Sequence, residues 1–184
     1  MSIQQPKSPA EAAMLRTWEA HLAAEFERHD VEATMATMTA EPSVLHVGTL
    51  TGGFGAAAVR RFYAESFLTA HPPDTVTTVV GRVIGDACIV DQVHYRCTHT
   101  IAMPWLLPGI APTGKPFAVV FVVVVEFAGG LIAHERIFFD QAAILAQLDL
   151  LDAAALPVVG GEAAEALRGA PVRPNRLIDR ARNR

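Results

Sequence analysis

The sequence has no apolar stretch long enough to cross a membrane. Its longest, Phe117 to Val125, has nine residues and ends at Glu126, whereas a membrane-spanning helix needs about 20. The first ten residues, MSIQQPKSPA, contain no apolar core of the kind found in a secretory signal peptide. Charged residues are also few, at 18%, against 51% hydrophobic residues, which excludes a disordered chain. We therefore expect a soluble cytoplasmic protein with a sizeable core.

The chain is equally poor in the motifs of disulfide, metal and cofactor chemistry. Its only cysteines, Cys88 and Cys97, fall in one predicted strand about 30 Å apart, far beyond disulfide reach. No dinucleotide-binding glycine motif, phosphate-binding loop or nucleophile elbow occurs. His94 and His99 are five residues apart and point to opposite faces of that strand, so together with His134 they make no metal site. The sequence predicts neither a cofactor nor a metal.

Charge is unevenly distributed along the chain. Residues 168–184 carry six Arg and one Asp, a net charge of +5, whereas residues 1–167 carry −9. An acidic body is a poor partner for nucleic acid. We expect the basic tail to lie on this body or on a sister subunit rather than on RNA.

Hydrophobic periodicity predicts the order of helices and strands. Leu15, Trp18, Leu22 and Phe26 recur at helical spacing. The predicted helices span residues 9–28, 30–38, 56–68 and 140–151, and the predicted strands span 43–49, 75–84, 87–100, 116–127 and 131–139. The segment TGGFG is predicted as a turn and Gly85-Asp86 as a hairpin turn. Residues 1–152 then form one domain, and residues 153–184 form an irregular basic C-terminal extension.

This order, with most helices first and hairpin-linked strands after them, is typical of an α+β fold. We expect a curved antiparallel sheet with helices over its concave face, enclosing a pocket. Strand 116–127 is apolar on both faces and should be central. The opposite face of the sheet needs a cover, for which a second copy of the chain, in a homodimer, is the expected solution.

Several short motifs occur in a characteristic order along the chain. They are Pro42…His46, Pro73-Asp74, Gly85-Asp86, Thr98-His99, Pro112-Thr113-Gly114-Lys115, Glu135, and Asp140 followed by Leu145-Ala146-Gln147-Leu148. Over about residues 10–150 the chain resembles the SnoaL-like polyketide cyclases, or ester cyclases, of the nuclear transport factor 2-like superfamily. The resemblance implies a cone-shaped, cystatin-like fold and cofactor-free chemistry. The superfamily hosts cyclases, ketosteroid isomerases, dehydratases, epoxide hydrolases and non-catalytic binders, so fold alone does not settle function.

Strand alternation predicts which residues of a strand share a face. The two sets are Asp91, Tyr95 and His99 on strand 87–100, and Glu135, Ile137 and Phe139 on strand 131–139. By resemblance to the ketosteroid isomerases, both sets line the cavity. The same resemblance places His46 near the catalytic Asp of those enzymes.

Four residues are predicted to be catalytic, each with a simpler alternative. His46 would be a general base, since imidazole titrates near pH 7, or else a strand histidine paired with a carboxylate. His99 would donate to a substrate oxyanion, or else bond the backbone at a strand edge. Asp140 matches the proposed acid/base of the cyclases, but an Asp before a helix is also a preferred N-cap. Glu135 is interpreted as a pocket carboxylate rather than an ion-pair member outside it.

Six further side chains are predicted to bind substrate: Asp91, Tyr95, Trp105, Tyr63, Ile137 and Phe139. Trp105 lies in the apolar loop 101–112, interpreted as a lid that selects a hydrophobic ligand; alternatively this loop packs on a dimer partner. Asp91 faces the pocket or pairs with Arg96 or Arg136.

These residues favour a cofactor-independent enzyme that acts on a small hydrophobic carbonyl compound. The predicted reaction is proton abstraction next to the carbonyl, followed by cyclisation, isomerisation or dehydration. His46 or Asp140 would take the proton, and His99, with Tyr95, would stabilise the enolate oxygen. The alternatives are an epoxide or lactone hydrolase on the same fold and a non-catalytic small-molecule binding protein.

Overall fold

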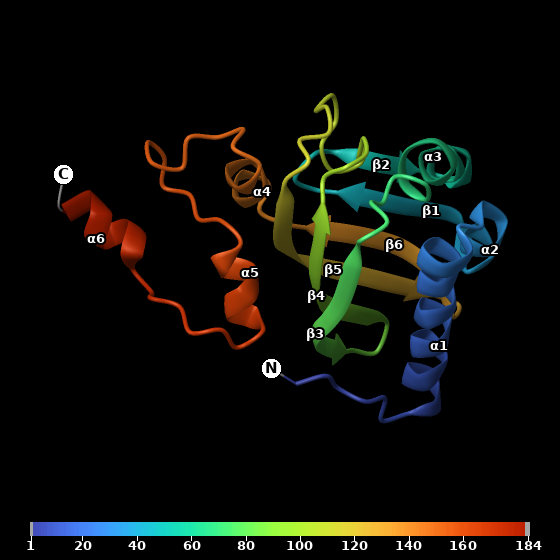
Figure 1. Cartoon of the computed structure of the whole chain (residues 1–184). Helices are drawn as coiled ribbons and strands as arrows, with labels where there is room; N and C mark the ends of the chain where they lie inside the picture. Colours follow the sequence, from blue (N-terminus) through green and yellow to red (C-terminus); the bar gives the residue numbers. More distant parts are fainter. Residues whose placement is uncertain (1, 183–184) are drawn as a thin grey trace.

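A single curved sheet of six strands forms the frame of the computed structural model, which describes residues 2–182 (Figure 1). Its strands are β1 (Met38–His46), β2 (Thr51–Phe54), β3 (Val76–Ile84), β4 (Cys88–Thr98), β5 (Pro116–Ala128) and β6 (Leu131–Phe138). Their spatial order is β2-β1-β6-β5-β4-β3. Neighbours are antiparallel except β1 and β6, which run parallel and so depart from the expected all-antiparallel sheet. The α+β class is confirmed.

Helices lie over the concave face and at the ends of the sheet. They are α1 (Pro9–Ala23), α2 (Val31–Ala36), α3 (Ala56–Phe62), α4 (Gln141–Gln147), α5 (Glu162–Leu167) and α6 (Arg176–Arg182), and π-helical turns Ala24–Arg28 and Tyr63–Phe67 continue α1 and α3. In the described part of the chain, no helix has the length and apolar character needed to cross a membrane.

Helix α1 begins where its sequence predicts. Ser8 caps it by accepting a hydrogen bond from the Glu11 N–H, and Pro9 occupies the first turn, where a missing N–H costs nothing. Met14, Trp18 and His21 form its buried stripe. The π-helical turn carries this stripe on to Glu25, which is also buried. The helix therefore presents one basic and one acidic side chain to the interior.

Strand β5 is the central strand that the sequence predicts. Its side chains alternate between buried and half-buried positions along the whole strand. It pairs with β4 without a register shift, from Cys88 opposite Glu126 to Thr98 opposite Pro116. This long, regular pairing keeps the inward faces of β4 and β5 in one row.

The segment TGGFG was predicted as a turn but forms β2 instead. Gly53 passes directly against α3: a Cβ atom there would lie 2.6 Å from the Ala58 carbonyl carbon. Gly52 has a φ of +136°, and a Cβ atom there would lie 2.0 Å from the Val44 carbonyl oxygen. Glycine here allows the close approach of another backbone. A pair of glycines in the sequence is equally typical of a turn, so the pattern alone does not separate the two uses.

Loop 101–112, interpreted as a lid, is instead packed into the body of the protein. Met103, Trp105, Leu106 and Leu107 are all buried. The Trp105 carbonyl accepts hydrogen bonds from Thr49 and Thr51, and its indole N–H donates to the Ala70 carbonyl over 3.1 Å. The loop therefore forms a fixed wall of the interior.

The C-terminal extension contains two helices where an irregular segment was expected. Helix α5 packs on β5, and its Glu165 forms an ion pair over 2.9 Å with the buried His94 of β4. Helix α6 stands away from the sheet and has no buried residue (Figure 1). The extension thus covers only part of the outer sheet face.

The rest of that outer face generates a prediction about assembly. Phe138 and Val83 are 43% and 54% exposed; Phe138 lies opposite the half-buried Val122 of β5, and Val83 lies opposite the half-buried Val90 of β4. Apolar surface of this kind is typical of an interface. We expect a homodimer in sedimentation equilibrium at micromolar concentration, and Phe138→Asp should shift it to monomer. Phe54→Asp, an exposed position on β2, is the control and should not. A wild-type monomer would refute the prediction.

Candidate active site

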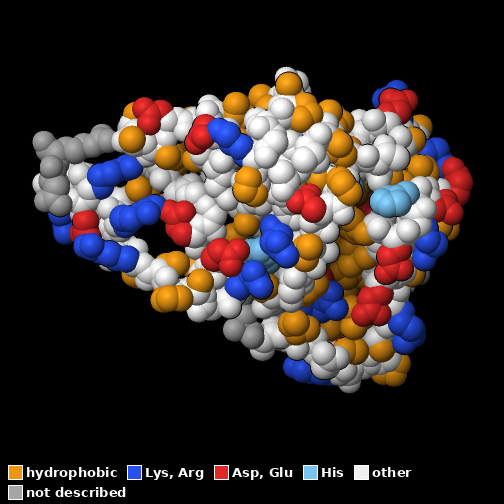
Figure 2. All heavy atoms as spheres, viewed as in Figure 1, with side chains coloured by type: hydrophobic (Ala, Val, Ile, Leu, Met, Phe, Trp, Pro, Cys, Tyr) orange, Lys and Arg blue, Asp and Glu red, His pale blue; other side chains and the backbone are white. Residues whose placement is uncertain are grey.

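A cavity of about 400 Å³ opens between α1 and the concave face of the sheet. Its volume lies within the range of small-molecule sites. Its walls are mainly apolar and aromatic: Trp18, Leu22, Phe26, Val44, Tyr63, Phe67, Val79, Val93, Tyr95, Trp105, Phe121, Val123 and Ile137. Figure 2 shows hydrophobic side chains gathered in a hollow beside α1, with acidic side chains along one side of it. The exposed Glu19 and Glu27 belong to the lining.

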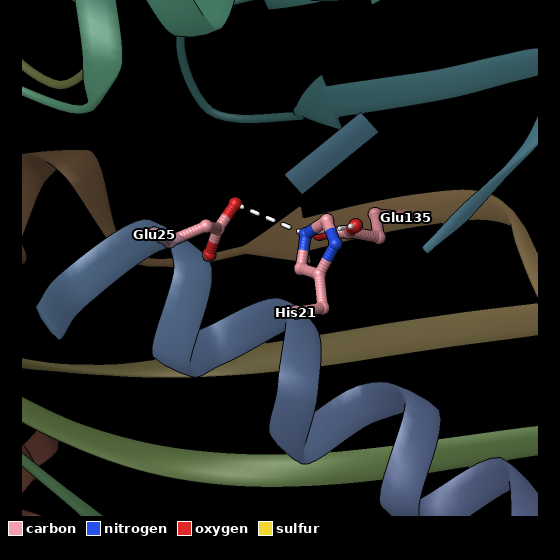
Figure 3. A group of neighbouring side chains, drawn as sticks. All are labelled: His21, Glu25 and Glu135. Carbon is pink, nitrogen blue, oxygen red and sulfur yellow. Dashed lines mark hydrogen bonds and ion pairs between the residues drawn. The ribbon is translucent and has the colours of Figure 1, made fainter. Parts of the chain in front are cut away.

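A cluster of three ionisable side chains borders the cavity: Glu25 and Glu135 line it, and His21 contacts both of them (Figure 3). His21 Nε2 lies 3.1 Å from Glu25 Oε1 and 3.0 Å from Glu135 Oε1, and all three side chains are buried. The contact between His21 and Glu135 is an ion pair and does not have the geometry of a hydrogen bond. Apart from this ion pair, Glu135 Oε1 has no hydrogen-bond partner. The Tyr63 hydroxyl lies 3.2 Å from the same His21 nitrogen. Glu25, Glu135 and Tyr63 all face the cavity.

Thr37 fixes the protonation of His21. Its hydroxyl donates to the Thr34 carbonyl over 2.6 Å and therefore has no proton left for His21. His21 Nδ1, 2.6 Å from that hydroxyl oxygen, must be the donor. Nε2 faces two carboxylates and needs a proton as well, since a bare lone pair there would be repelled. His21 is thus an imidazolium held between two acids.

Electrostatics agree with this assignment. Burial lowers the pKa of His21, but the charges of Glu135 and Glu25 outweigh burial and raise it to about 10. Burial raises the pKa of Glu25, although the charge of His21 opposes the rise. Burial, together with the two nearby carboxylates, keeps the Tyr63 hydroxyl protonated by raising its pKa well above the usual value. The cluster therefore offers a carboxylate beside proton donors.

The same three side chains could hold a metal ion. Among the described residues, this is the one group of at least three His, Cys, Asp or Glu side chains whose ligand atoms all lie within 4.8 Å of one another. A metal would need His21 Nε2 to be deprotonated. The imidazolium already balances the carboxylates, so the arrangement suits acid–base chemistry without a metal.

Sequence reasoning found Glu135 but missed His21 and Glu25. The available signal was their position on the apolar stripe of the first helix, four residues apart and in line with Trp18. A His and a Glu at buried positions of one helix face are costly unless they are paired, so they mark either an ion pair or a site.

Asp91, predicted to bind substrate, lies behind the cavity wall. It is fully buried and forms two 2.6 Å hydrogen bonds with Arg82, which was not among its expected partners. Its second oxygen also accepts the Trp18 indole N–H over 2.9 Å. Trp18 in turn stacks on His21, with ring centroids 5.6 Å apart. Asp91 thus holds Trp18 and, through it, the imidazolium.

Two histidines also line the cavity, His46 and His71, of which the sequence predicted only His46. Each ring flanks Trp105, at centroid distances of 5.1 and 5.2 Å. Burial lowers the pKa of His46 to about 3 and that of His71 to about 4. Both imidazoles are therefore neutral at pH 7 and are weak bases.

The structure brings some predicted residues into the cavity and leaves others outside. His46, Glu135, Tyr63, Tyr95, Trp105 and Ile137 line it. His99 does not: it is buried beside Thr113, whose N–H donates to His99 Nδ1. Phe139 packs against Phe121 from outside the lining. Asp140 is exposed and caps α4 by accepting the Ala143 N–H over 3.0 Å.

The fold is the one shared by solved structures described as NTF2-like and as ketosteroid isomerase-like. Residues 12–148 match the family model of the SnoaL-like polyketide cyclases, and the chain belongs to this family. A search of curated proteins gave no match.

Solved structures share this fold at low identity. One protein from Jannaschia sp. CCS1, described as a SnoaL-like polyketide cyclase, has a TM-score of 0.63 and 19% identity over 80% of this chain and 99% of its own. TsrD from Streptomyces laurentii has a TM-score of 0.58 and 19% identity over 80% and 100%. SalBIII, an epoxide hydrolase/cyclase-like enzyme, has a TM-score of 0.53 and 17% identity over 71% and 92%. These likenesses establish the fold.

The capping role of Asp140 predicts a specific pattern of stability. Asp140→Asn should change the free energy of unfolding by at most about 0.5 kcal/mol, because Asn caps as well as Asp. Asp140→Ala should cost about 1 kcal/mol. Urea unfolding measures both. Equal losses in the two variants would contradict a capping role.

The His21 imidazolium predicts how stability depends on pH. A group whose pKa rises from 6.5 to about 10 on folding stabilises the protein fully below pH 6.5 and loses that effect as pH rises through 10. The raised pKa of Glu25 acts in the same direction. We expect the free energy of unfolding, measured in urea, to fall from pH 7 to pH 10 more steeply in the wild type than in His21→Asn. Parallel pH profiles would show that His21 is not the titrating group.

Proposed function

We propose that this protein is a cofactor-independent enzyme that removes a proton next to the carbonyl group of a small hydrophobic compound. Cyclisation, isomerisation or dehydration would follow from the resulting enolate. The observation that carries the proposal is Glu135 Oε1, a buried oxygen without a hydrogen-bond partner, in an apolar cavity beside an imidazolium. Membership of the SnoaL-like polyketide cyclase family supports the same chemistry.

Glu135 is the proposed general base. A buried carboxylate is less solvated than one in water and accepts a proton from carbon more readily. The His21 cation lies 3.0 Å from Glu135 Oε1 and orients the carboxylate. Asp91 and Trp18 act through His21 as positioning residues.

Tyr63 is the proposed proton donor to the enolate oxygen. Its hydroxyl has a raised pKa and it faces the cavity. A phenol next to the carbonyl oxygen would stabilise the negative charge that develops as the proton leaves carbon. Glu135 can then return the proton to another carbon atom, which isomerises the substrate, or the enolate can attack a second carbonyl of the same molecule, which closes a ring.

This assignment replaces His46, His99 and Asp140 as the leading candidates. An imidazole with a pKa of about 3 is too weak a base for the task. His99 and Asp140 are not among the cavity-lining residues. The main alternative, a non-catalytic binding protein, fits the cavity but gives no reason to bury three ionisable groups at one end of it, since each costs several kcal/mol to desolvate.

Deuterium exchange tests the proposal without knowledge of the natural substrate. We would incubate the protein with 2-tetralone, a bicyclic ketone, in D₂O and follow loss of the hydrogens next to its carbonyl by NMR. The wild type should accelerate exchange, and Glu135→Gln should lower the rate by about 10²-fold or more. The matched control is Glu126→Gln, an outer-face carboxylate paired with Arg136, which should leave the rate unchanged.

Binding is measured separately, so that lack of exchange is not confused with lack of a complex. The two tryptophans of the chain, Trp18 and Trp105, both line the cavity, and their fluorescence reports its occupation. Bound 2-tetralone that exchanges no faster than in buffer would refute the proposed chemistry. Equal rates in the wild type and Glu135→Gln would remove Glu135 from it.

A further inference from the structure

Two further polar atoms at the cavity have no hydrogen-bond partner. They are His46 Nδ1 and His71 Nε2, both buried and without a hydrogen bond. Both side chains line the cavity. The other nitrogen of His71 lies 3.4 Å from the Tyr95 hydroxyl, so Nε2 is the nitrogen left free. A buried polar atom without a partner is uncommon in folded proteins and costs free energy.

Packing holds both rings in place. His46 and His71 lie on either side of a shared aromatic pair, with centroids 5.6 and 4.8 Å from Phe67 and 5.1 and 5.2 Å from Trp105. Trp105 is itself fixed by hydrogen bonds at both its indole N–H and its carbonyl. The two nitrogens cannot easily turn to find partners in the protein, so a ligand is the remaining source.

The geometry points to a hydroxyl-binding subsite formed by His46 and His71. The inference rests on the proposed function and adds that the carbonyl substrate carries a hydroxyl group at the end remote from its acidic carbon. A neutral imidazole offers one N–H donor and one nitrogen acceptor. A hydroxyl group both donates and accepts, so it can satisfy whichever role each free nitrogen has.

An anionic group fits the two histidines less well than a hydroxyl. Burial lowers the pKa of both imidazoles; His71 lowers that of His46 further, and His29 lowers that of His71 further. A bound carboxylate would need an imidazolium to balance it. A neutral hydroxyl has no such requirement.

Strand register sets the spacing between the two polar ends. Glu135 of β6 lies opposite Val44 of β1, and His46 follows two residues further along the same strand face. From the strand spacing and the rise per residue, the Glu135 and His46 backbones are about 8 Å apart. That length matches a bicyclic skeleton with a carbonyl on one ring and a hydroxyl on the other.

A matched pair of ligands tests the subsite. 2-Tetralone and 6-hydroxy-2-tetralone differ by one hydroxyl group, and both are titrated by tryptophan fluorescence. We expect the hydroxylated ketone to bind the wild type about tenfold more tightly. The advantage should disappear in His46→Leu and His71→Leu, whose affinity for 2-tetralone itself should not fall.

Conservative variants provide a rescue. His46→Asn keeps a polar atom near Nδ1 and His71→Gln keeps one near Nε2, so both should retain part of the advantage that the Leu variants lose. The control His134→Gln alters a histidine of the outer sheet face, bonded to Ser43, and should bind both ketones as the wild type does.

The outcome separates this inference from the proposed chemistry. Binding needs no turnover, so the tenfold advantage should also be present in Glu135→Gln. Equal affinity of the wild type for the two ketones would overturn the subsite, even if exchange is catalysed. So would an advantage that survives in both Leu variants. If a Leu variant does not fold, the wild-type comparison and the Asn and Gln variants still decide.

Discussion

The buried imidazolium of His21, held between Glu25 and Glu135, is the interaction on which the rest of the site depends. It ties the first helix to the last strand of the sheet, across a long stretch of sequence. Burying three ionisable groups costs more than an apolar packing of the same volume would. Such an arrangement is retained for what the charges do, and here they place the Glu135 carboxylate, paired with His21, against a cavity that is mainly apolar.

Around this cluster, the supporting contacts are arranged in layers. Thr37 directs the protons of His21 toward the carboxylates. Arg82 and Asp91 hold the indole of Trp18 against the imidazolium. Burial of these partners lets each one keep a single orientation, as the proposed acid–base chemistry requires.

The fold was largely predictable from the sequence, because it depends on patterns that repeat. Alternation along β5 indicated a central strand, and the Asp residues before α2 and α4 act as the N-caps that their positions suggest. Glycines misled the prediction at β2, where they serve close packing against α3 rather than a turn. Parallel pairing of β1 with β6 joins segments far apart in the chain, and no local pattern predicts such a pairing.

The site was only partly predictable, for a related reason. Strand alternation correctly grouped Glu135 with Ile137 and Tyr95 with the inward face of β4. His71 lies in an irregular segment after α3, where neither helical nor strand periodicity predicts which way a side chain points. Trp105 was predicted to bind substrate as part of a lid. Its loop is instead a fixed wall, because Trp105 forms hydrogen bonds with Thr49, Thr51 and Ala70, which are distant in sequence.

The parallel pairing of β1 with β6 also bears on the order in which the molecule is made. Met38–His46 can complete its place in the sheet only after Leu131–Phe138 has left the ribosome, and the same late strand supplies Glu135. Until then His21 and Glu25 face an unfinished interior. Contacts of such large sequence separation slow folding, since a long loop must close before they contribute. Completion of the sheet and assembly of the cluster of His21, Glu25 and Glu135 are therefore one event.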